Sequence, residues 1–330
     1  MRKPKMKLWK KLALAAGIIV IILAAALIFI GNYFVNFALV RADTGEKDVA
    51  PTSVVTAEDQ AEIDRNWQDI TQRRDQWLAQ SRREDAGITS ADGLALRGEA
   101  FYAPESTHRW LLAIHGYNSN KESMRHIASA YGLAGWNVLT PDMRAHGESE
   151  GTYIGMGWLD RQDVLLWIDY IISLDPEAEI VLHGVSMGAA TVMMTAGEDL
   201  PENVKGIVED CGYTSVWDIF EDELAVLYHL PSFPILTVTE QVAKVRAGYG
   251  FHEASALEQV KKARVPILFI HGSEDNFVHT EMVYPLYDAC PTAKDLLVVE
   301  GAGHGQAYSK DPALYLETVF AFLEENCLAP

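Results

Sequence analysis

The stretch EIVLHGVSMGAATVMMTA, residues 179–196, joins a β-branched apolar run to a helix-forming run through a Gly-x-Ser-x-Gly pentapeptide. Glycines two positions before and two positions after Ser186 let neighbouring backbone segments approach closely at a sharp turn. Such a strand-turn-helix unit lifts a serine clear of a sheet, and the dipole of the following helix favours a developing oxyanion. The pattern therefore predicts a strand that ends in a nucleophilic Ser186.

A second match to the same template, HGESEG at residues 146–151, lacks this context. The strand expected before it is broken by Pro141, and the residues after it, TYIGMGW, are typical of a loop. Glu148 and Glu150 would also place negative charge beside an oxyanion and oppose its formation. We therefore predict that Ser149 belongs to a loop and does no chemistry.

Short apolar, β-branched runs alternate with helical stretches from about residue 87 onward. This alternation indicates βαβ units, and it predicts an α/β fold with a mostly parallel sheet of the eight-stranded type and helices on both faces. The expected helices are residues 121–134, 158–174, 188–199 and 305–325. The expected strands are residues 94–102, 109–115, 136–140, 179–183, 204–210, 265–271 and 295–300.

Residues 211–264 separate two of the expected strands by too many positions for a simple crossover. They contain helical stretches that are broken at PSFP, residues 231–234, and they are rich in aromatic side chains. Ligands of open α/β sheets bind outside the carboxyl ends of the strands, so an insertion at this point would cover the site. We interpret residues 211–264 as a small helical cap.

A neutral serine hydroxyl needs a base, and the base needs an acid that orients it. With this type of turn the three residues follow the chain order serine, acid, histidine. Asp275 and His304 each follow an expected strand, in loops at the same edge of the sheet as Ser186. We therefore predict Asp275 as the acid and His304 as the base.

Three other residues compete for these roles. Glu274 and Asp210 compete as the acid, and Asp210 ends the strand after the nucleophile, where this architecture can also place an acid. His279 competes as the base, but it lies on the same loop as Asp275 and is poorly placed to reach Ser186 as well. These alternatives remain open at the level of the sequence.

The oxyanion of an acyl-transfer reaction needs two aimed N–H groups. In this arrangement one comes from the residue after the nucleophile, Met187, and the other from the loop after an earlier strand. HGYNSN, residues 115–120, forms that loop, and the amide of Tyr117 is the natural candidate. The phenol of Tyr117 could add a donor, although a pocket wall is the better interpretation of this side chain.

Residues 12–30 form a run of 19 residues without a charge or a strongly polar group, and only two asparagines interrupt apolar character up to Val40. Such a run can cross a hydrocarbon core of about 30 Å as a helix. A signal peptide cut after Ala42 is the alternative, but the apolar regions of signal peptides are shorter, roughly 7–15 residues. We predict a retained transmembrane signal-anchor helix over residues 12–40.

Residues 1–11 contain six lysines or arginines and no acidic residue, and few basic residues follow the apolar run closely. This asymmetry predicts a cytoplasmic N-terminus, with the body of the protein on the outer side of the cell membrane. The expected organisation is a cytoplasmic basic segment at 1–11, the membrane helix at 12–40, a linker and juxtamembrane amphipathic helix at 41–85, and a main domain at 86–330.

The rest of the chain is acidic, because the six basic residues of the N-terminal segment leave 21 basic against 46 acidic residues. A body with this charge repels phosphate backbones, which argues against nucleic acid as a partner. The sequence has no His-Glu-x-x-His, no paired Cys-x-x-Cys and no Gly-rich nucleotide loop, so we expect neither a metal nor a cofactor. Cys211, Cys290 and Cys327 are too few for a disulfide scaffold, although a bridge between the last two remains open.

Six motifs, in the order found here, resemble the α/β-hydrolase superfamily. Within it the chain is similar to bacterial membrane-anchored hydrolases of the serine aminopeptidase and acylaminoacyl-peptidase-like group. The resemblance implies Ser186 as nucleophile, Asp275 as acid and His304 as base, with the amides of Tyr117 and Met187 as the oxyanion hole. The match covers about residues 86–328, and its motifs are HGYNSN (115–120), PDMRAHGESEG (141–151), HGVSMGAAT (183–191), DCGYTS (210–215), VPILFIHGSEDNFV (265–278) and GAGHG (301–305). The resemblance also implies that five residues belong to a structural loop: Asp142, Arg144, His146, Gly147 and Ser149.

The combined expectation is a membrane-anchored serine hydrolase that cleaves a carboxylic ester or a related acyl bond through an acyl-enzyme. The membrane helix and the apolar cap favour a small-molecule or lipid-like acyl substrate. A peptidase that cleaves amides is the alternative within the class, and a non-catalytic binding module is the alternative outside it. The fold does not identify the substrate.

Overall fold

The computed structural model describes residues 8–41 and 55–328, so most of the expected basic segment and linker lies outside the described residues. The chain divides into two compact units. We call them the helical unit, which combines Met1–Val40 with Phe220–Gly250, and the sheet unit, which combines Arg41–Ile219 with Phe251–Pro330.

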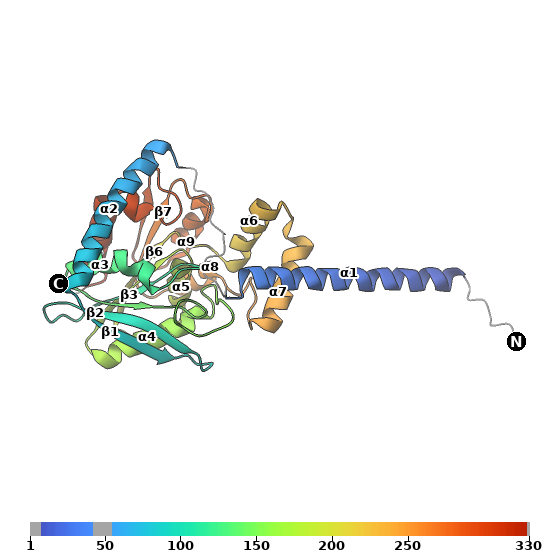
Figure 1. The fold of residues 1–330 in the computed structure, drawn as a ribbon, viewed down its shortest axis with the longest axis horizontal. Helices are drawn as coiled ribbons and strands as arrows, with labels where there is room; N and C mark the ends of the chain where they lie inside the picture. Colours follow the sequence, from blue (N-terminus) through green and yellow to red (C-terminus); the bar gives the residue numbers. More distant parts are fainter. Residues whose placement is uncertain (1–7, 42–54, 329–330) are drawn as a thin grey trace. The chain divides into compact units, whose positions relative to one another are not determined.

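The sheet unit is built on an eight-stranded sheet in the order β1-β2-β4-β3-β5-β6-β7-β8 (Figure 1). β2 is antiparallel to both of its neighbours, and the remaining neighbouring pairs are parallel. This confirms the expected mostly parallel α/β sheet. The strands are β1 (Arg82–Thr89), β2 (Ala95–Tyr102), β3 (Arg109–Ile114), β4 (Asn137–Pro141), β5 (Glu179–Val185), β6 (Val204–Asp210), β7 (Ile267–Gly272) and β8 (Lys294–Val299).

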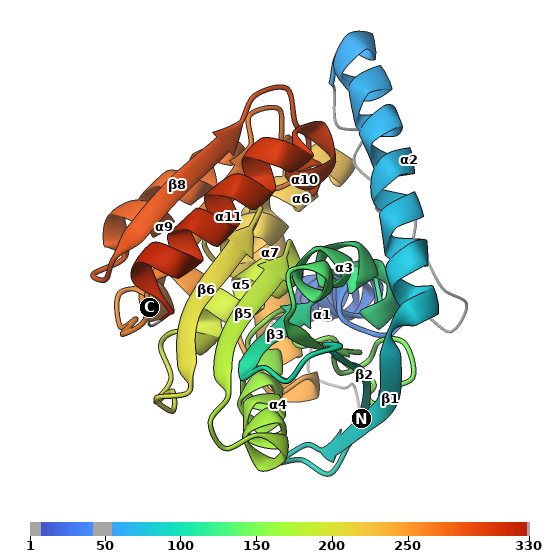
Figure 2. The same ribbon diagram turned by 90° about the vertical axis from the view of Figure 1, so that its left-hand side faces the viewer.

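Helices cover both faces of this sheet (Figure 2). In the sheet unit they are α2 (Ala57–Gln80), η1 (Lys121–Met124), α3 (Arg125–Leu133), α4 (Asp160–Leu174), α5 (Met187–Thr195), α8 (Ala256–Val260), η2 (Thr280–Met282), α9 (Val283–Ala289), α10 (Ala307–Lys310) and α11 (Pro312–Asn326). Alternate strand residues point to opposite faces. Val208 and Ile270 accordingly share a core cluster with Tyr315 of α11. Phe269 points the other way and stands edge-on to Tyr287 of α9, with ring centroids 5.9 Å apart.

β1 is a strand that the sequence analysis does not predict. The juxtamembrane helix expected within residues 41–85 ends at Gln80, and residues 82–89 pair with β2 along their whole length. Their sequence, RREDAGIT, has Ala86 as its one buried residue, because β1 lies at the edge of the sheet. A polar edge strand lacks the apolar alternation that identifies a half-buried strand. The sheet therefore begins four residues before the expected start of the main domain.

α2 packs on the sheet unit through Ile63, Ile70 and Trp77, which are buried. These positions recur at helical spacing and form one stripe along the helix. The indole of Trp77 lies over Gly132 of α3, where an added Cβ would be 2.3 Å from the ring nitrogen. The amphipathic helix predicted within residues 41–85 thus packs on the sheet unit through its apolar stripe.

The helical unit contains α1 (Leu8–Ala38), α7 (Ser232–Arg246) and most of α6 (Val216–Tyr228). α1 has a mean hydropathy of 3.1 over an 18-residue window and is a candidate membrane span by length and composition. α7 packs against α1, where Val238 lies 3.2 Å from the position of a Cβ on Gly31. Residues 211–264, which the sequence predicts as a helical cap, thus contain helices, and α7 packs on the candidate membrane helix.

Candidate active site

Ser186 lies at the sharp turn between β5 and α5. Its backbone angles, φ 58° and ψ −118°, form a conformation that side-chain-bearing residues rarely adopt. Two glycines make the turn sterically possible. A Cβ on Gly184 would lie 2.1 Å from the Gly188 carbonyl oxygen, and a Cβ on Gly188 would lie 2.1 Å from the carbonyl oxygen of Ile114. The strained turn presents the Ser186 hydroxyl to His304, whose ring nitrogen is 2.8 Å away.

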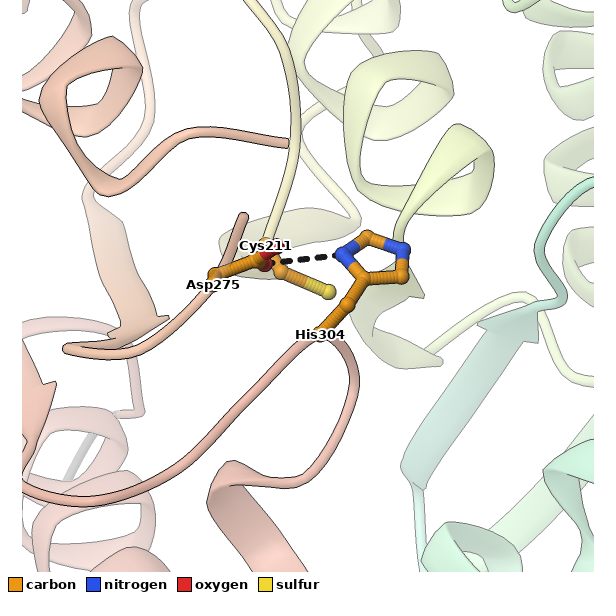
Figure 3. A group of neighbouring side chains, drawn as sticks. All are labelled: Cys211, Asp275 and His304. Atoms are coloured by element: carbon orange, nitrogen blue, oxygen red, sulfur yellow. Dashed lines mark hydrogen bonds and ion pairs between the residues drawn. The ribbon is translucent and has the colours of Figure 1, made fainter. Parts of the chain in front are cut away.

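Ser186, His304 and Asp275 form one chain of hydrogen bonds. Nε2 of His304 lies 2.8 Å from Ser186 Oγ, and Nδ1 lies 2.8 Å from Asp275 Oδ2; Figure 3 shows the second of these contacts. A neutral imidazole in this setting donates its Nδ1–H to the carboxylate and accepts the serine proton at Nε2. The structure thus brings together the three residues that the sequence nominates, in the loops that follow β5, β7 and β8.

Asp275 is buried and nevertheless ionised. Burial raises its pKa, but hydrogen bonds from His271 and His304 outweigh burial and bring the pKa to about 2. Its second oxygen accepts hydrogen bonds from the N–H groups of Phe277, at 3.1 Å, and Val278, at 3.0 Å. The carboxylate is therefore held charged and fixed, as a group that orients an imidazole and stabilises an imidazolium must be.

His271 is a second histidine on Asp275 that the sequence analysis does not assign to the site. Its Nε2–H donates to the Val278 carbonyl at 2.9 Å and lies 3.3 Å from Asp275 Oδ2, the oxygen that His304 also contacts. Burial lowers the pKa of His271, but the adjacent Asp275 carboxylate outweighs burial and raises it. The one signal in the sequence is its place at a strand end, four residues before the acid.

The competing candidates have other partners. Asp210 accepts a hydrogen bond from the hydroxyl of Tyr315 at 2.9 Å, and burial raises its pKa to about 6. Glu274 is exposed at the protein surface, and His279 is the residue that precedes η2. The bridge made by His304 therefore joins the serine to the acid that the sequence favours.

Ser149 lies in a different environment, although its motif is the same. Its hydroxyl donates to the Asp142 carbonyl at 2.6 Å and accepts from the N–H of Arg97 at 2.9 Å. Gly147 has φ 50°, and a Cβ there would lie 2.3 Å from the Asp142 carboxylate. The Ser149 hydroxyl therefore joins the loop to the residue that follows β4 and to β2, where the sequence predicts a structural loop.

The buried charges around this loop are paired. Arg144 contacts Asp163 at 2.6 Å and Asp92 at 3.1 Å. Lys121 contacts Asp142 at 2.8 Å, and the same carboxylate accepts from the backbone N–H of Lys121 at 2.7 Å. Removing one partner of a buried pair leaves an uncompensated charge. The loop is therefore a structural element whose polar groups are already occupied.

The loop after β3 lies against the nucleophile. A Cβ on Gly116 would be 3.3 Å from Ser186 Cβ and 3.4 Å from the Val185 carbonyl oxygen. Tyr117 follows directly, and burial raises the pKa of its phenol, in keeping with a side chain that forms a wall. Met187 is the first residue of α5, where backbone N–H groups have no partner within the helix. The two amides nominated for the oxyanion hole thus belong to the segments that flank Ser186.

Cys211 forms a compact cluster with Asp275 and His304 (Figure 3), in which one potential ligand atom from each residue lies within 4.8 Å of the others. Burial raises the pKa of the Cys211 thiol well above its usual range, which favours the neutral thiol. The other two residues are engaged in the hydrogen-bond chain described above. Cys211, Cys290 and Cys327 are free thiols. Cys211 thus lies beside two of the three residues nominated for the active site.

The chain is similar to known hydrolases in sequence and in fold. A family model described as serine aminopeptidase, S33, matches residues 105–221. The protein YqkD of Bacillus subtilis (strain 168) is 30% identical over 242 residues, which cover 72% of this chain and 78% of YqkD. The esterase Pf2001 of Pyrococcus furiosus has a TM-score of 0.61 and 21% identity, with 79% of this chain and 94% of the esterase covered. The acylaminoacyl peptidase of Pyrococcus horikoshii has a TM-score of 0.57 and 16% identity, and the match covers 75% of this chain and 42% of the peptidase.

Proposed function

This chain belongs to the α/β-hydrolase superfamily, and from that membership we propose that it is a serine hydrolase with Ser186 as nucleophile, His304 as base and Asp275 as acid. The observation that carries the proposal is the unbroken chain of hydrogen bonds from the serine hydroxyl through the imidazole to an ionised carboxylate. The strained turn that holds the serine supports the same role, because strain of this kind persists where the surrounding structure imposes it for function.

In the proposed reaction, Nε2 of His304 takes the hydroxyl proton of Ser186 as the oxygen attacks the carbonyl carbon of the substrate. The tetrahedral oxyanion collapses, and the imidazolium, stabilised by Asp275, returns the proton to the departing alkoxide or amine. Water, deprotonated by the same imidazole, then hydrolyses the acyl-enzyme. Asp275 stays ionised throughout, in keeping with its pKa of about 2.

We assign the oxyanion hole to the backbone N–H groups of Met187 and Tyr117. Met187 begins α5, so its amide lies at the positive end of that helix dipole. Gly116 lets the segment that carries Tyr117 approach the nucleophile closely. Donors that are fixed in advance toward the developing negative charge are usually the largest single contribution to this class of catalysis.

We further propose that α1 anchors the enzyme in the cell membrane, with the N-terminus in the cytoplasm and the hydrolase domain outside. The length and hydropathy of α1 support a membrane span, and the six basic residues in 1–11 support the orientation. Attachment to a bilayer favours a small-molecule or lipid-like acyl ester as the substrate. The proposed chemistry uses side chains and backbone amides alone, without a cofactor or a metal.

A serine peptidase that cleaves amides is the second candidate, and the match of residues 105–221 to the serine aminopeptidase family favours it. An esterase and a peptidase can use the same triad, so the two activities are distinguished by comparing the turnover of an ester with that of an amide. A non-catalytic binding module is less favoured, because every group of the triad is present and hydrogen-bonded.

Burst kinetics on the purified full-length protein test the proposed activity. A p-nitrophenyl ester is expected to release one equivalent of p-nitrophenol per active site rapidly and then turn over more slowly, as acyl-enzymes do. The matched aminoacyl p-nitroanilide is expected to react more slowly; a higher kcat/KM on the anilide would favour the peptidase. A folded protein that turns over neither substrate would contradict the hydrolase proposal and favour the binding module.

The anchoring is tested by extraction of membranes at alkaline pH. The full chain is expected to remain in the membrane pellet, because its span is retained. Release of a soluble protein whose N-terminal residue is Asp43 would instead support a signal peptide that is cut after Ala42.

A further inference from the structure

We propose that the corner between α6 and α7 is a second membrane contact, which places apolar side chains in the headgroup region of the bilayer beside α1. This inference rests on the membrane anchoring proposed above. We define the corner segment as residues 224–239, LAVLYHLPSFPILTVT, which belong with α1 to the helical unit.

The corner segment exposes large apolar side chains and carries no Asp, Glu, Lys or Arg. Val226 is 55% exposed, Leu227 46% and Phe233 75%. Acidic residues return directly outside the segment, at Glu223 and Glu240, in a chain whose net charge is −19. Single exposed apolar residues are ordinary, but several of them grouped on a charge-free corner are typical of an interaction surface.

α1 indicates where the bilayer ends. Its charge-free run, residues 12–30, is about 28 Å long as a helix, which is close to the thickness of a hydrocarbon core. Directly after this run, Asn32 and Asn36 accept hydrogen bonds from the Arg246 guanidinium at 3.0 Å and 2.7 Å. A charged group and two amides are costly in hydrocarbon and belong at its polar boundary. The boundary of the bilayer therefore lies at about Asn32.

α7 brings the corner segment to this boundary. Its contacts with α1 move from Asn36, which meets Arg246 at the end of α7, to Gly31, which meets Val238 earlier in the helix. Following α7 further in the same direction leads toward the earlier turns of α1, as far as Phe233, where the backbone is extended and the helix is interrupted. Figure 1 shows α6 and α7 beside the C-terminal part of α1, while the rest of α1 extends without them.

Aromatic rings hold the end of α6 at the same level. Tyr228 stands edge-on to Phe34 and Phe37 of α1, with ring centroids 5.1 Å and 5.9 Å apart. Tyr33 of the same turn is about half exposed. Tyrosine is enriched where a bilayer meets water, because its ring is apolar and its hydroxyl polar. The end of α6, through Tyr228, and α7, through Val238, thus both contact α1 at residues 31–37, close to the proposed boundary of the bilayer.

A bilayer is favoured over a protein partner because the corner segment continues an apolar surface of α1. Ile28 and Phe29 are exposed on α1 just before the boundary, at 54% and 76%. These two residues and the corner segment belong to the same compact unit. Ile28 and Phe29 lie just before Gly31, the residue at which α1 contacts α7. An apolar helical surface that joins a membrane span at the level of the headgroups fits lipid. A second copy of the chain is the rival occupant.

Depth-dependent quenching on the full-length protein in lipid nanodiscs tests the inference. Each protein carries one introduced cysteine, labelled with the fluorophore NBD, in a background in which the partly exposed Cys327 is replaced by alanine and the buried Cys211 and Cys290 are kept. The same background without an introduced cysteine is the control for labelling of the two buried thiols. The labelled positions are all exposed apolar residues, so the substitutions leave the core intact: Phe233→Cys and Val226→Cys in the corner segment, Ile19→Cys in the span, and Leu133→Cys on the sheet unit.

We expect the two corner labels to be quenched by lipids that carry a nitroxide near the headgroup, several-fold more than by iodide in water. The Ile19 label should respond to deep nitroxides, and the Leu133 label to iodide alone. If the Ile19 label reports lipid while the corner labels behave like Leu133, this inference fails and the anchor stands. If the Ile19 label is quenched by iodide, the anchor and the inference both fail. Corner labels shielded from both quenchers, with energy transfer between labelled copies, would assign the segment to a second copy and overturn the membrane contact.

Discussion

The hexapeptides HGESEG, residues 146–151, and HGVSMG, residues 183–188, share a template but not a structure. Ser186 lies on a strained turn with its hydroxyl 2.8 Å from His304. Ser149 is buried, and its hydroxyl is used by two backbone groups. HGVSMG lies between the end of β5 and the start of α5, whereas HGESEG lies in a loop. The comparison teaches that the elements on either side of this motif, and not its letters, indicate a nucleophile.

Replacing Ser186 with alanine should give the largest effect. We expect Ser186→Ala to lower kcat/KM for an ester by about 10⁴-fold or more, because the attacking oxygen is gone. Thermal stability should change little, because the hydroxyl is bound to His304 and not to the core. Initial rates and melting temperatures of one preparation check both expectations. Residual activity close to that of the wild type would mean that another residue attacks.

Removing the charge of the acid should give the next largest effect. Asp275→Asn keeps the size of the side chain but loses the carboxylate that orients His304, and we expect kcat to fall by about 10³- to 10⁴-fold. Glu274→Gln is the matched control, since this neighbour is exposed, and it should leave kcat unchanged. Equal losses in both variants would contradict the assignment of the acid.

His271 should have a smaller effect on the same carboxylate. His271→Phe removes the donor on Asp275, and we expect kcat to fall about 10- to 100-fold with KM nearly unchanged, because the acid is less firmly positioned. His271→Asn retains an N–H donor and should recover part of the loss. A change in KM alone, or no recovery with asparagine, would indicate a merely structural role. Steady-state kinetics of the three proteins separate these outcomes.

Ser149→Ala tests the other half of the comparison. The N–H of Arg97 loses its acceptor, and we expect the free energy of unfolding to fall by about 1–3 kcal/mol. Activity per folded molecule should stay at the wild-type level. Urea unfolding, followed by activity titrated against active sites, measures both quantities. A stable variant with lost activity would place Ser149 in the chemistry and break the comparison.

Glu209 should give the smallest effect, visible in the pH dependence of stability. Burial raises the pKa of Glu209 to about 8 from an ordinary value of 4.5. The carboxyl therefore favours the folded state fully below pH 4.5, and this contribution is lost as the pH rises from 4.5 to 8. Glu209→Gln should flatten the decline of the melting temperature across this window. An unchanged slope would show that Glu209 does not titrate there.

The sequence predicts those parts of the molecule whose signals are local. Strands with continuous apolar runs, such as β5 and β7, are buried on both faces and are evident in the sequence. The proposed triad is predictable because Ser186 and Asp275 follow such strands, and all three residues occur in the expected chain order. β1 is not predictable in this way, because it is an edge strand that pairs through its backbone while its side chains remain polar and exposed.

Contacts between distant segments explain the remaining gaps. The attachment of α7 to α1 depends on the small size of Gly31 opposite Val238, more than 200 residues apart, and nothing in either segment alone indicates it. His271 enters the site because β7 and its loop turn it toward the carboxylate that His304 also binds. A histidine that ends a strand is equally typical of core packing, so its partner could not be read from the sequence.

Mapping the adduct of a fluorophosphonate probe tests the central claim most directly. The probe is applied to the folded full-length protein and to Ser186→Ala and Ser149→Ala, and the modified peptide is identified by mass spectrometry. We predict a single adduct on Ser186, retained in Ser149→Ala and absent from Ser186→Ala. An adduct on Ser149, or labelling that persists without Ser186, would contradict the account of the two hexapeptides and of the catalytic triad.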